Sequence, residues 1–255
     1  MHEDVQRRLA HGSFQASHAS RRRRTRMRAA LRRLGDSWLA HRVLEVLDRR
    51  TENRMTEYGM LAQAFEFARI NQVAGDYFEF GLWRGKTFLY AHKMKRRYRL
   101  PDVVLRGFDS FEGLPAHERS KDGIWSAGQF ACSEEEFRGI IRRAGVRDDE
   151  YRLVKGFYQD SLNAELDARM QGVKAAVVYI DCDLYESTLS VLDFVAKYLV
   201  NGSVVCFDDY YNNRGDPRQG EQRALAEFLA RNGRLTFVPY FDYSPLGKSF
   251  IVRTE

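Results

Sequence analysis

The chain has 255 residues, of which 44% are hydrophobic and 30% are charged. This length is enough for one substantial hydrophobic core, and the composition excludes a low-complexity chain. The most apolar stretch, residues 175–180, is far shorter than the ~20 residues that a membrane-spanning helix needs, so a bilayer-embedded protein is excluded.

The net charge of +6 is distributed unevenly along the chain. Residues 1–50 hold 13 Arg, no Lys and 5 acids, which gives +8, and the remaining residues carry −2. The excess is concentrated in a basic N-terminal arm, residues 1–28, which lacks hydrophobic periodicity. Such an arm can recruit RNA. However, a run of four arginines is more often a solvated tail, so nucleic acid is the disfavoured partner.

Cysteine usage and the N-terminus indicate the compartment. Cys132, Cys182 and Cys206 form no CxxC pair, which argues against a disulfide framework and a structural zinc site. The N-terminus carries no apolar segment of the kind found in secretory signals. A reduced, cytoplasmic setting is therefore expected.

Helical periodicity begins after the basic arm. Apolar stripes predict one helix within residues 29–50 and a second over residues 56–71. We expect residues 29–72 to form a helical extension. Its stripes must cover either the edge of a sheet or a partner subunit, which favours a homo-oligomer.

Strands and helices alternate over residues 73–255, which predicts one α/β domain. The predicted strands cover residues 76–80, 103–108, 151–154, 175–180, 203–207, 235–240 and 249–253. The predicted helices cover residues 86–98, 134–143, 161–170, 185–200 and 220–231. Repeated βα units predict a mostly parallel sheet with helices on both faces. The last two strands leave no room for a helix between them, so that pair is expected to be antiparallel.

Ligands bind such sheets at the carboxyl ends of the strands. The turn after the first strand, residues 79–87, reads EFGLWRGKT. It has three residues between Gly81 and Gly85, whereas a P-loop needs four, and it lacks the GxGxxG of a dinucleotide site. The remaining interpretations are a plain βα turn and the first turn of a methyltransferase that binds S-adenosylmethionine. Asp109, at the end of the second strand, is placed either to bind a ribose or to cap the following segment.

Four acids follow two consecutive buried strands: Asp181, Asp183, Asp208 and Asp209. Carboxylates in one cleft repel each other unless they are protonated or bridged by a cation. Oxygen ligands favour Mg²⁺, Mn²⁺ or Ca²⁺ over zinc. An acidic cleft without metal is the alternative. Because no histidine follows His117, a carboxylate such as Asp183 is the better candidate for a general base.

Together these segments resemble the macrocin O-methyltransferase family of S-adenosylmethionine-dependent enzymes. The resemblance is carried by EFGLWRG at 79–85, DSFEGLP at 109–115, KGFYQDSL at 155–162, DCDLYEST at 181–188 and FDDY at 207–210. It implies a Rossmann-like methyltransferase fold with a mostly parallel seven-stranded sheet and an antiparallel last strand. It also implies methyl transfer to a hydroxyl of a sugar or of a sugar-containing natural product.

The resemblance assigns roles to individual residues. It implies a divalent ion, Mg²⁺ or Mn²⁺, held by Asp181, Asp208 and Asp209, with Asp183 as the general base beside it. Cofactor contacts are expected from Glu79, Gly81, Trp83, Gly85, Asp109, Ser110, Phe111, Gly156, Phe157 and Asp160. Acceptor contacts are expected from Trp125 and Phe130, in a segment over residues 115–130 that resembles part of a lid, and from Tyr185, Tyr210 and Tyr211.

Two alternatives from other classes remain. A metal-dependent glycosyltransferase also carries a DxD after a buried strand, as residues 181–183 do here. The turn at Glu79, Asp109 and the Asp208–Asp209 pair favour methyl transfer instead. The second alternative is an RNA-binding or RNA-modifying protein recruited by the basic arm.

Overall fold

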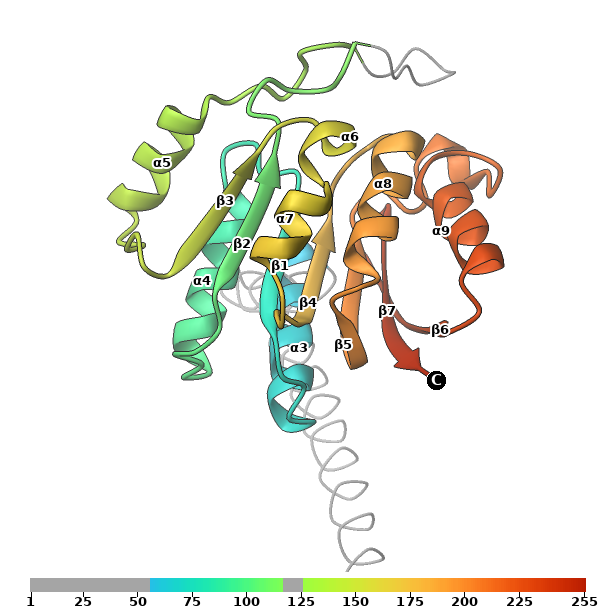
Figure 1. The fold of residues 1–255 in the computed structure, drawn as a ribbon, viewed down its shortest axis with the longest axis horizontal. Helices are drawn as coiled ribbons and strands as arrows, with labels where there is room; N and C mark the ends of the chain where they lie inside the picture. Colours follow the sequence, from blue (N-terminus) through green and yellow to red (C-terminus); the bar gives the residue numbers. More distant parts are fainter. Residues whose placement is uncertain (1–55, 117–125) are drawn as a thin grey trace, which may run out of the picture. The chain divides into compact units, whose positions relative to one another are not determined.

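Seven strands form one mixed sheet in the part of the chain that the computed structural model describes, residues 56–116 and 126–255 (Figure 1). The strands are β1 (Asp76–Phe80), β2 (Leu105–Asp109), β3 (Tyr151–Lys155), β4 (Ala175–Ile180), β5 (Leu199–Phe207), β6 (Leu235–Tyr243) and β7 (Gly247–Thr254). Their order in the sheet is β3-β2-β1-β4-β5-β7-β6. The first five strands are parallel, and β7 runs antiparallel to both β5 and β6. The predicted sheet is therefore confirmed, including its antiparallel end.

Helices cover both faces of this sheet. They are α3 (Glu57–Ile70), α4 (Lys86–Arg97), α5 (Glu134–Arg143), α6 (Tyr158–Ser161), α7 (Ala164–Arg169), α8 (Tyr185–Val195) and α9 (Gly220–Arg231), with a 3-10 turn η1 (Asn213–Gly215). Buried side chains of α3, α4 and α5 form a core on one face, and those of α7, α8 and α9 form a core on the other. Within the described ranges, no helix is long and apolar enough to cross a membrane.

The helix predicted over residues 56–71 is confirmed as α3, and its apolar stripe packs on this chain's own sheet. The Thr56 side chain caps the helix by accepting a hydrogen bond from the Gly59 amide. The buried residues of the helix are Met60, Leu61, Ala64, Phe65 and Ala68. This stripe therefore needs no partner subunit. The helix predicted within residues 29–50, the basic arm and Trp125 lie outside the described residues, and the homo-oligomer stays a prediction.

Several predicted boundaries differ from the structure, and the largest differences lie between α8 and β5. The helix expected over residues 185–200 ends at Val195, and β5 begins at Leu199 instead of Ser203. The strand extends because Leu199 pairs with Ala175 of β4. The Ser203 hydroxyl holds the register shift that follows, since it accepts from the Val200 amide and donates to the Ala175 carbonyl.

The helix expected over residues 161–170 forms only over Ala164–Arg169, as α7, and Ser161 is instead the last residue of α6. Asn163 separates the two helices with an extended backbone, and its side chain accepts a hydrogen bond from the Leu166 amide, which starts α7.

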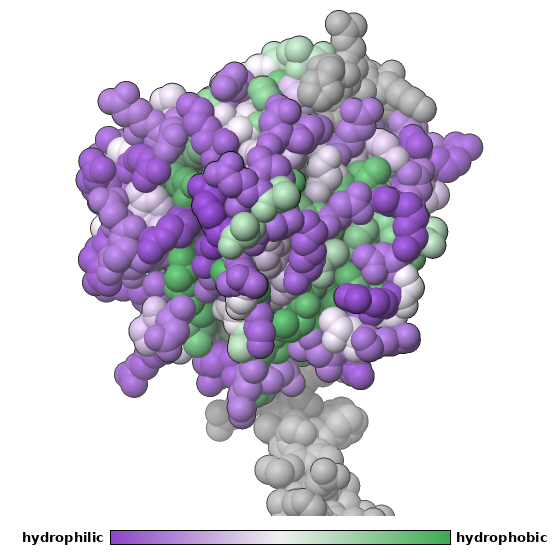
Figure 2. Space-filling view, viewed as in Figure 1, coloured by the Kyte–Doolittle hydropathy of each residue, from purple (hydrophilic) through white to green (hydrophobic). Residues whose placement is uncertain are grey.

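On the face seen in Figure 2, hydrophilic residues predominate, and hydrophobic residues lie in smaller patches between them. The apolar side chains of the described residues thus mainly fill the two cores.

Candidate active site

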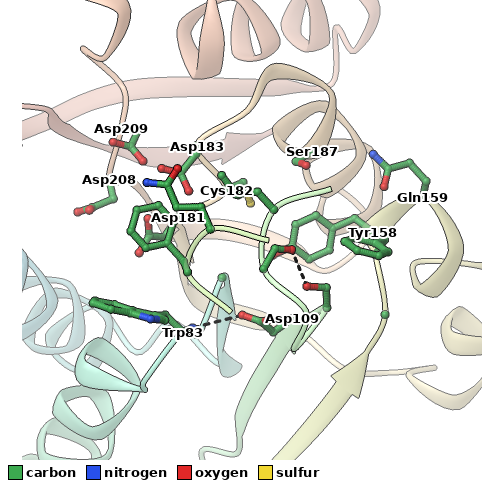
Figure 3. A pocket seen from close by; sticks show the side chains of 18 residues that line it. Trp83, Asp109, Tyr158, Gln159, Asp181, Cys182, Asp183, Ser187, Asp208 and Asp209 are labelled. Atoms are coloured by element: carbon green, nitrogen blue, oxygen red, sulfur yellow. Dashed lines mark hydrogen bonds between the residues drawn. The ribbon is translucent and has the colours of Figure 1, made fainter. Parts of the chain in front are cut away.

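A cavity of about 300 Å³ opens at the carboxyl ends of the parallel strands, where the strand order reverses between β1 and β4 (Figure 3). The segments after all five parallel strands contribute to its wall. The predicted site residues that line it are Gly81, Trp83, Asp109, Ser110, Phe130, Gly156, Phe157, Asp181, Asp183, Asp208 and Asp209. The structure therefore brings together residues from each of the five segments that the sequence singled out.

Seven further residues line the cavity without having been predicted to do so. They are Gly113, Leu114, Gln129, Tyr158, Gln159, Cys182 and Ser187. Tyr158 and Gln159 directly follow two predicted positions after β3, so closer attention to the same strand end would have found them. Leu114 and Gln129 meet through a hydrogen bond from the Leu114 amide to the Gln129 carbonyl. No local sequence signal predicts that pairing.

Glu79 lies beneath the cavity rather than on its wall. Its side chain is fully buried, and its two oxygens accept hydrogen bonds from the hydroxyls of Tyr77 (2.5 Å) and Thr87 (2.6 Å). Tyr77 and Glu79 are two residues apart on β1 and so point to the same face of the sheet. Burial raises the pKa of Glu79 to about 8. Its hydrogen bond with Thr87 joins β1 to the first turn of α4, and its contact with the cofactor stays a prediction.

Three other expected cofactor residues also lie off the cavity wall. Gly85 begins α4 with φ +73°, and a Cβ there would come within 2.8 Å of the Phe137 ring, so this glycine is required for packing. Phe111 is buried against the same ring, with centroids 5.8 Å apart. Asp160 lies on α6 and lines a separate hollow beside β3.

The three tyrosines expected to contact an acceptor are held by neighbouring side chains and do not line the cavity. Tyr185 donates a hydrogen bond to Glu227 (2.5 Å). Tyr211 donates to Asp242 (2.9 Å) and accepts from Lys248 (2.9 Å). The Tyr210 ring packs on Phe207 and Phe250.

Asp109 fixes the loop that forms one wall of the cavity. One carboxylate oxygen accepts hydrogen bonds from the amides of Leu82 (2.6 Å) and Trp83 (3.3 Å). The other oxygen accepts from the Phe111 amide (2.6 Å). Burial raises the pKa of Asp109, and these backbone hydrogen bonds oppose that effect. The carboxylate thus joins the turns after β1 and β2, and it keeps lone pairs for a ligand hydroxyl.

Gly81 allows β1 and β4 to approach each other at the base of the cavity. Its φ is +88°, and a Cβ at this position would lie 1.9 Å from the Asp181 carbonyl oxygen. No other residue fits there without moving the backbone that carries Asp181. The glycine expected from sequence therefore serves the close approach of two strand ends.

The acids after β4 and β5 form one cluster. Asp181, Asp183 and Asp209 each bring a carboxylate oxygen within 4.8 Å of the others. This set differs from the expected one, because Asp183 takes the place of Asp208. In the described part of the chain, none of the four aspartates forms an ion pair with Lys or Arg.

Asp208 does not belong to this trio, and its carboxylate accepts a hydrogen bond from a different residue. Its Oδ1 accepts from the Tyr179 hydroxyl at 2.5 Å. Tyr179 belongs to the core formed with α3, α4 and α5, so this bond holds Asp208 toward that face, whereas the Asp209 amide donates to a side chain of α9. The second oxygen of Asp208 is not engaged in this bond and stays available to a ligand.

The electrostatics of the cluster favour bound protons or a bound cation. Burial raises the pKa of Asp181 well above its usual range, and repulsion from the other three aspartates adds to the effect. Burial also raises the pKa of Asp183 to about 6, of Asp208 to about 6 and of Asp209 to about 8. A cation among these oxygens would remove the repulsion and restore the ionised forms.

The backbone at Asp183 adopts a left-handed conformation, with φ +59°. It is the central residue of a three-residue turn in which the Leu184 amide donates to the Cys182 carbonyl at 2.6 Å. This conformation is costly for a residue with a side chain. It turns the Asp183 carboxyl back toward Asp181 and Asp209, as Figure 3 shows.

Glu221 is a fifth acid beside the cluster that sequence reasoning missed. It lies in the first turn of α9 and is only 1% exposed. One of its oxygens accepts a hydrogen bond from the Asp209 amide at 3.1 Å. The other oxygen is buried without a hydrogen-bond partner among the described residues. Glu221 follows Asp209 by twelve residues and begins a helix, where an acid is common, so no motif in the sequence marks it.

A family model described as macrocin O-methyltransferase (TylF) matches residues 2–233 of the chain. The chain belongs to this family. Membership in the macrocin O-methyltransferase family confirms the expected enzyme class and implies S-adenosylmethionine as methyl donor. It does not support the glycosyltransferase alternative, which depended on residues 181–183. The RNA-binding alternative depended on the basic arm, which lies outside the described residues.

Curated relatives include proteins of Streptomyces and Micromonospora species. A tetracenomycin-C 4'-O-methyltransferase of Streptomyces olivaceus, which acts on the 8-demethyl-8-(2,3-dimethoxy-alpha-L-rhamnosyl) form, is 33% identical over 147 residues, or 54% of each chain. Demethyldecarbamoylnovobiocin O-methyltransferase of Streptomyces niveus is 30% identical over 195 residues, or 72% of this chain and 68% of that one. The matches thus span about half of the first relative and about two thirds of the second.

Solved structures agree with the fold. The O-methyltransferase NovP superposes with a TM-score of 0.62 at 26% identity, over 78% of this chain and 79% of that one. The calicheamicin methyltransferase CalS11 superposes with a TM-score of 0.64 at 22% identity, over 89% and 91%, and supports the fold alone.

Proposed function

We propose that the chain transfers a methyl group from S-adenosylmethionine to a hydroxyl of a sugar or of a sugar-containing natural product, with the assistance of a divalent cation. The observation that carries this proposal is the cluster of Asp181, Asp183 and Asp209 at the edge of the cavity. A methyltransferase does not need an acidic cluster to bind its positively charged donor. Carboxylates gathered beside the donor site are instead suited to holding a cation that binds the acceptor.

The cavity suits S-adenosylmethionine on the side away from the acids. Gly81 and Trp83 present the turn after β1, and Asp109 presents a buried carboxylate toward ribose hydroxyls. Gly156 and Phe157 present the turn after β3. These residues bind and orient the donor, which supplies the methyl group when bound and leaves as S-adenosylhomocysteine.

The acidic cluster fits a divalent cation by its chemistry and spacing. Oxygens bound about 2.1 Å from one Mg²⁺ lie about 3 to 4 Å apart, so the oxygens of the cluster are within a small side-chain movement of that spacing. Asp181 and Asp209 belong to both the expected and the observed trio. We assign Asp208 as the third ligand, because the Tyr179 hydrogen bond orients it as ligating carboxylates are commonly oriented. Such a cation would act as a Lewis acid that lowers the pKa of the acceptor hydroxyl.

Asp183 then accepts the proton of the acceptor hydroxyl. Burial raises the pKa of this carboxyl, and a cation beside it would favour the ionised form, which is the form that can accept a proton. The hydroxyl oxygen forms a bond to the methyl carbon as the carbon–sulfur bond breaks, and its proton passes to Asp183. The strained turn at Asp183 holds the carboxyl in place before the acceptor arrives.

The proposal is tested with labelled S-adenosylmethionine, a panel of glycosylated natural products and free sugars, and either Mn²⁺ or EDTA. We expect label on a sugar hydroxyl of at least one glycoside, loss of turnover in EDTA, and loss in Asp181→Asn. Asp149→Asn, at an exposed position far from the cavity, is the matched control and should retain activity. Full turnover in EDTA would overturn the role of the cation, and label only on nitrogen or on RNA would overturn the acceptor class.

A further inference from the structure

We infer that Glu221 is a positioning residue that sets the cation affinity of the site through the backbone amide of Asp209. The inference rests on the cation-assisted function proposed above, but it concerns a residue that touches neither cation nor acceptor. It follows from one hydrogen bond, which the Asp209 amide donates to Glu221 Oε2, and from the burial of both residues.

The position of Glu221 is costly for the fold. A buried carboxyl oxygen without a hydrogen-bond partner loses its hydration and gains nothing in return. Glu221 Oε1 is such an atom in the described part of the chain. Burial also raises the pKa of the Glu221 carboxyl well above its usual range, and the negative charge of the neighbouring aspartates adds to this cost of ionisation. A small apolar residue at this point of α9 would avoid both costs, so the stability of the fold does not account for a glutamate here.

The hydrogen bond with Glu221 fixes the backbone position of Asp209. Asp209 is the second residue beyond the end of β5, where the sheet no longer fixes the backbone. Its carbonyl accepts from the Asn212 amide at 2.9 Å, and its carboxyl has a long contact of 3.5 Å with the Asn212 side chain. The flanking amides of Asp208 and Tyr211 donate to the carbonyls of Ile180 and Leu246, and the Asp209 amide between them donates to Glu221 of α9.

The first residues of α9 lie close to the segment that carries Asp209. Gly220 begins the helix with φ +53°, and a Cβ there would lie 2.7 Å from Asn213 Nδ2. Glycine at position 220 therefore lets the start of α9 lie near the segment that follows Asp209. The helix itself starts without a side-chain cap, so the Glu221 carboxyl is free to reach the Asp209 amide instead of serving its own helix.

Two substitutions of Glu221 separate the effect of side-chain length from the effect of charge. Glu221→Gln keeps the reach and the acceptor oxygen but removes the charge. Glu221→Asp keeps the charge but withdraws the acceptor by one methylene. A positioning role through the amide predicts that Gln preserves cation binding and that Asp loses it. A purely electrostatic role predicts the reverse.

The experiment is titration of the purified full-length chain with Mn²⁺, followed by calorimetry or by the EPR signal of the free ion, in the presence of S-adenosylhomocysteine. We expect Glu221→Asp and Glu221→Ala to weaken Mn²⁺ binding about 10-fold or more, as loss of an outer support commonly does, with Glu221→Gln close to the parent. Glu165→Ala, on the exposed side of α7, is the control and should match the parent. Affinity for S-adenosylhomocysteine should be unchanged in all four variants.

A double-mutant cycle with Asp209→Asn separates positioning from general damage. If Glu221 acts through Asp209, Glu221→Asp adds little loss of Mn²⁺ affinity once Asp209 is Asn. The inference is overturned if Glu221→Asp binds Mn²⁺ as the parent does, if Gln loses as much as Asp, or if the losses add in full. A parent chain that binds S-adenosylhomocysteine but no Mn²⁺ would overturn the proposed cation together with this inference, whereas an unaffected Glu221→Asp would leave the proposed function standing.

Discussion

The hydroxyl of Tyr179, inside β4, donates a hydrogen bond to Asp208 at the end of β5, with 2.5 Å between the two oxygens. The bond crosses from one strand to its neighbour and is made on the face opposite to Asp209. It holds one carboxylate of the acidic cluster in place and leaves that carboxylate one oxygen for a ligand. Tyr179 itself is fully buried, so burial of its polar hydroxyl costs free energy of folding.

Removal of this hydroxyl should loosen the cation site. We predict that Tyr179→Phe weakens Mn²⁺ binding by about 10-fold, because the outer partner of a ligating carboxylate is lost. Affinity for S-adenosylhomocysteine, measured by calorimetry, should not change. Tyr198→Phe is the matched control, since its hydroxyl donates to Asp167 away from the cavity. Equal Mn²⁺ affinity in the parent and Tyr179→Phe would show that Asp208 is not a ligand.

The roles of Asp183 and Asp208 can be told apart by two measurements on each variant. Asp208→Asn should lose Mn²⁺ affinity, because a charged ligand is removed. Asp183→Asn should keep most of that affinity but lose about 100-fold or more in kcat, since the base is gone. The opposite pattern, with affinity lost in Asp183→Asn and retained in Asp208→Asn, would make the trio of Asp181, Asp183 and Asp209 the ligand set.

Stability should depend on pH in a direction set by the raised pKa values of the cluster. Asp183, Asp208 and Asp209 have pKa values of about 6, 6 and 8 in the folded chain. They ionise near pH 4 when unfolded. The folded state therefore binds more protons between about pH 4 and about pH 8, and the free energy of unfolding falls as pH rises through that window.

Thermal unfolding in EDTA tests this prediction. The melting temperature should fall from about pH 5 to about pH 8, and Asp209→Asn should flatten the slope. Mn²⁺ should raise the melting temperature most at the alkaline end, because protons compete with the cation for the same oxygens. A melting temperature that climbs with pH in EDTA, or a Mn²⁺ effect that is the same at every pH, contradicts the account.

Gly81 should tolerate no side chain. Gly81→Ala places a methyl group against the Asp181 carbonyl oxygen, and we predict a loss of about 1–3 kcal/mol in stability together with much weaker S-adenosylhomocysteine binding. Gly145→Ala is the control, because Gly145 also has a positive φ, +84°, but open space around it. That variant should cost about 1–2 kcal/mol from the backbone alone and leave binding intact. Equal binding losses in both variants would contradict the steric argument.

Periodicity and composition were enough to predict the sheet. Continuous apolar runs such as residues 175–180 predicted buried parallel strands, and the structure confirms that strand at the same bounds. The start of β5 was missed because Leu199 and Val200 continue the apolar stripe of α8. Only pairing with Ala175 in space decides that they belong to the strand.

The composition of the site could be predicted, but its internal arrangement could not. Parallel strands that follow each other in the chain and lie side by side predicted that Asp181 and Asp209 would meet. Which carboxylates face each other depends on the residues beyond the strand ends, as at Asp183, where a left-handed turn redirects the side chain. No sequence motif marks Tyr179 or Glu221, because their contacts with the cluster are made across strands and loops.

The most direct test of a cation held between donor and acceptor is a crystal structure of the full chain with S-adenosylhomocysteine and Mn²⁺, measured at a wavelength where manganese scatters anomalously. The account predicts one anomalous peak coordinated by Asp181 and Asp209, with S-adenosylhomocysteine between the turns at Gly81 and Gly156. An occupied donor pocket with no manganese at the acids, at a concentration that saturates Mn²⁺-dependent turnover, would contradict it.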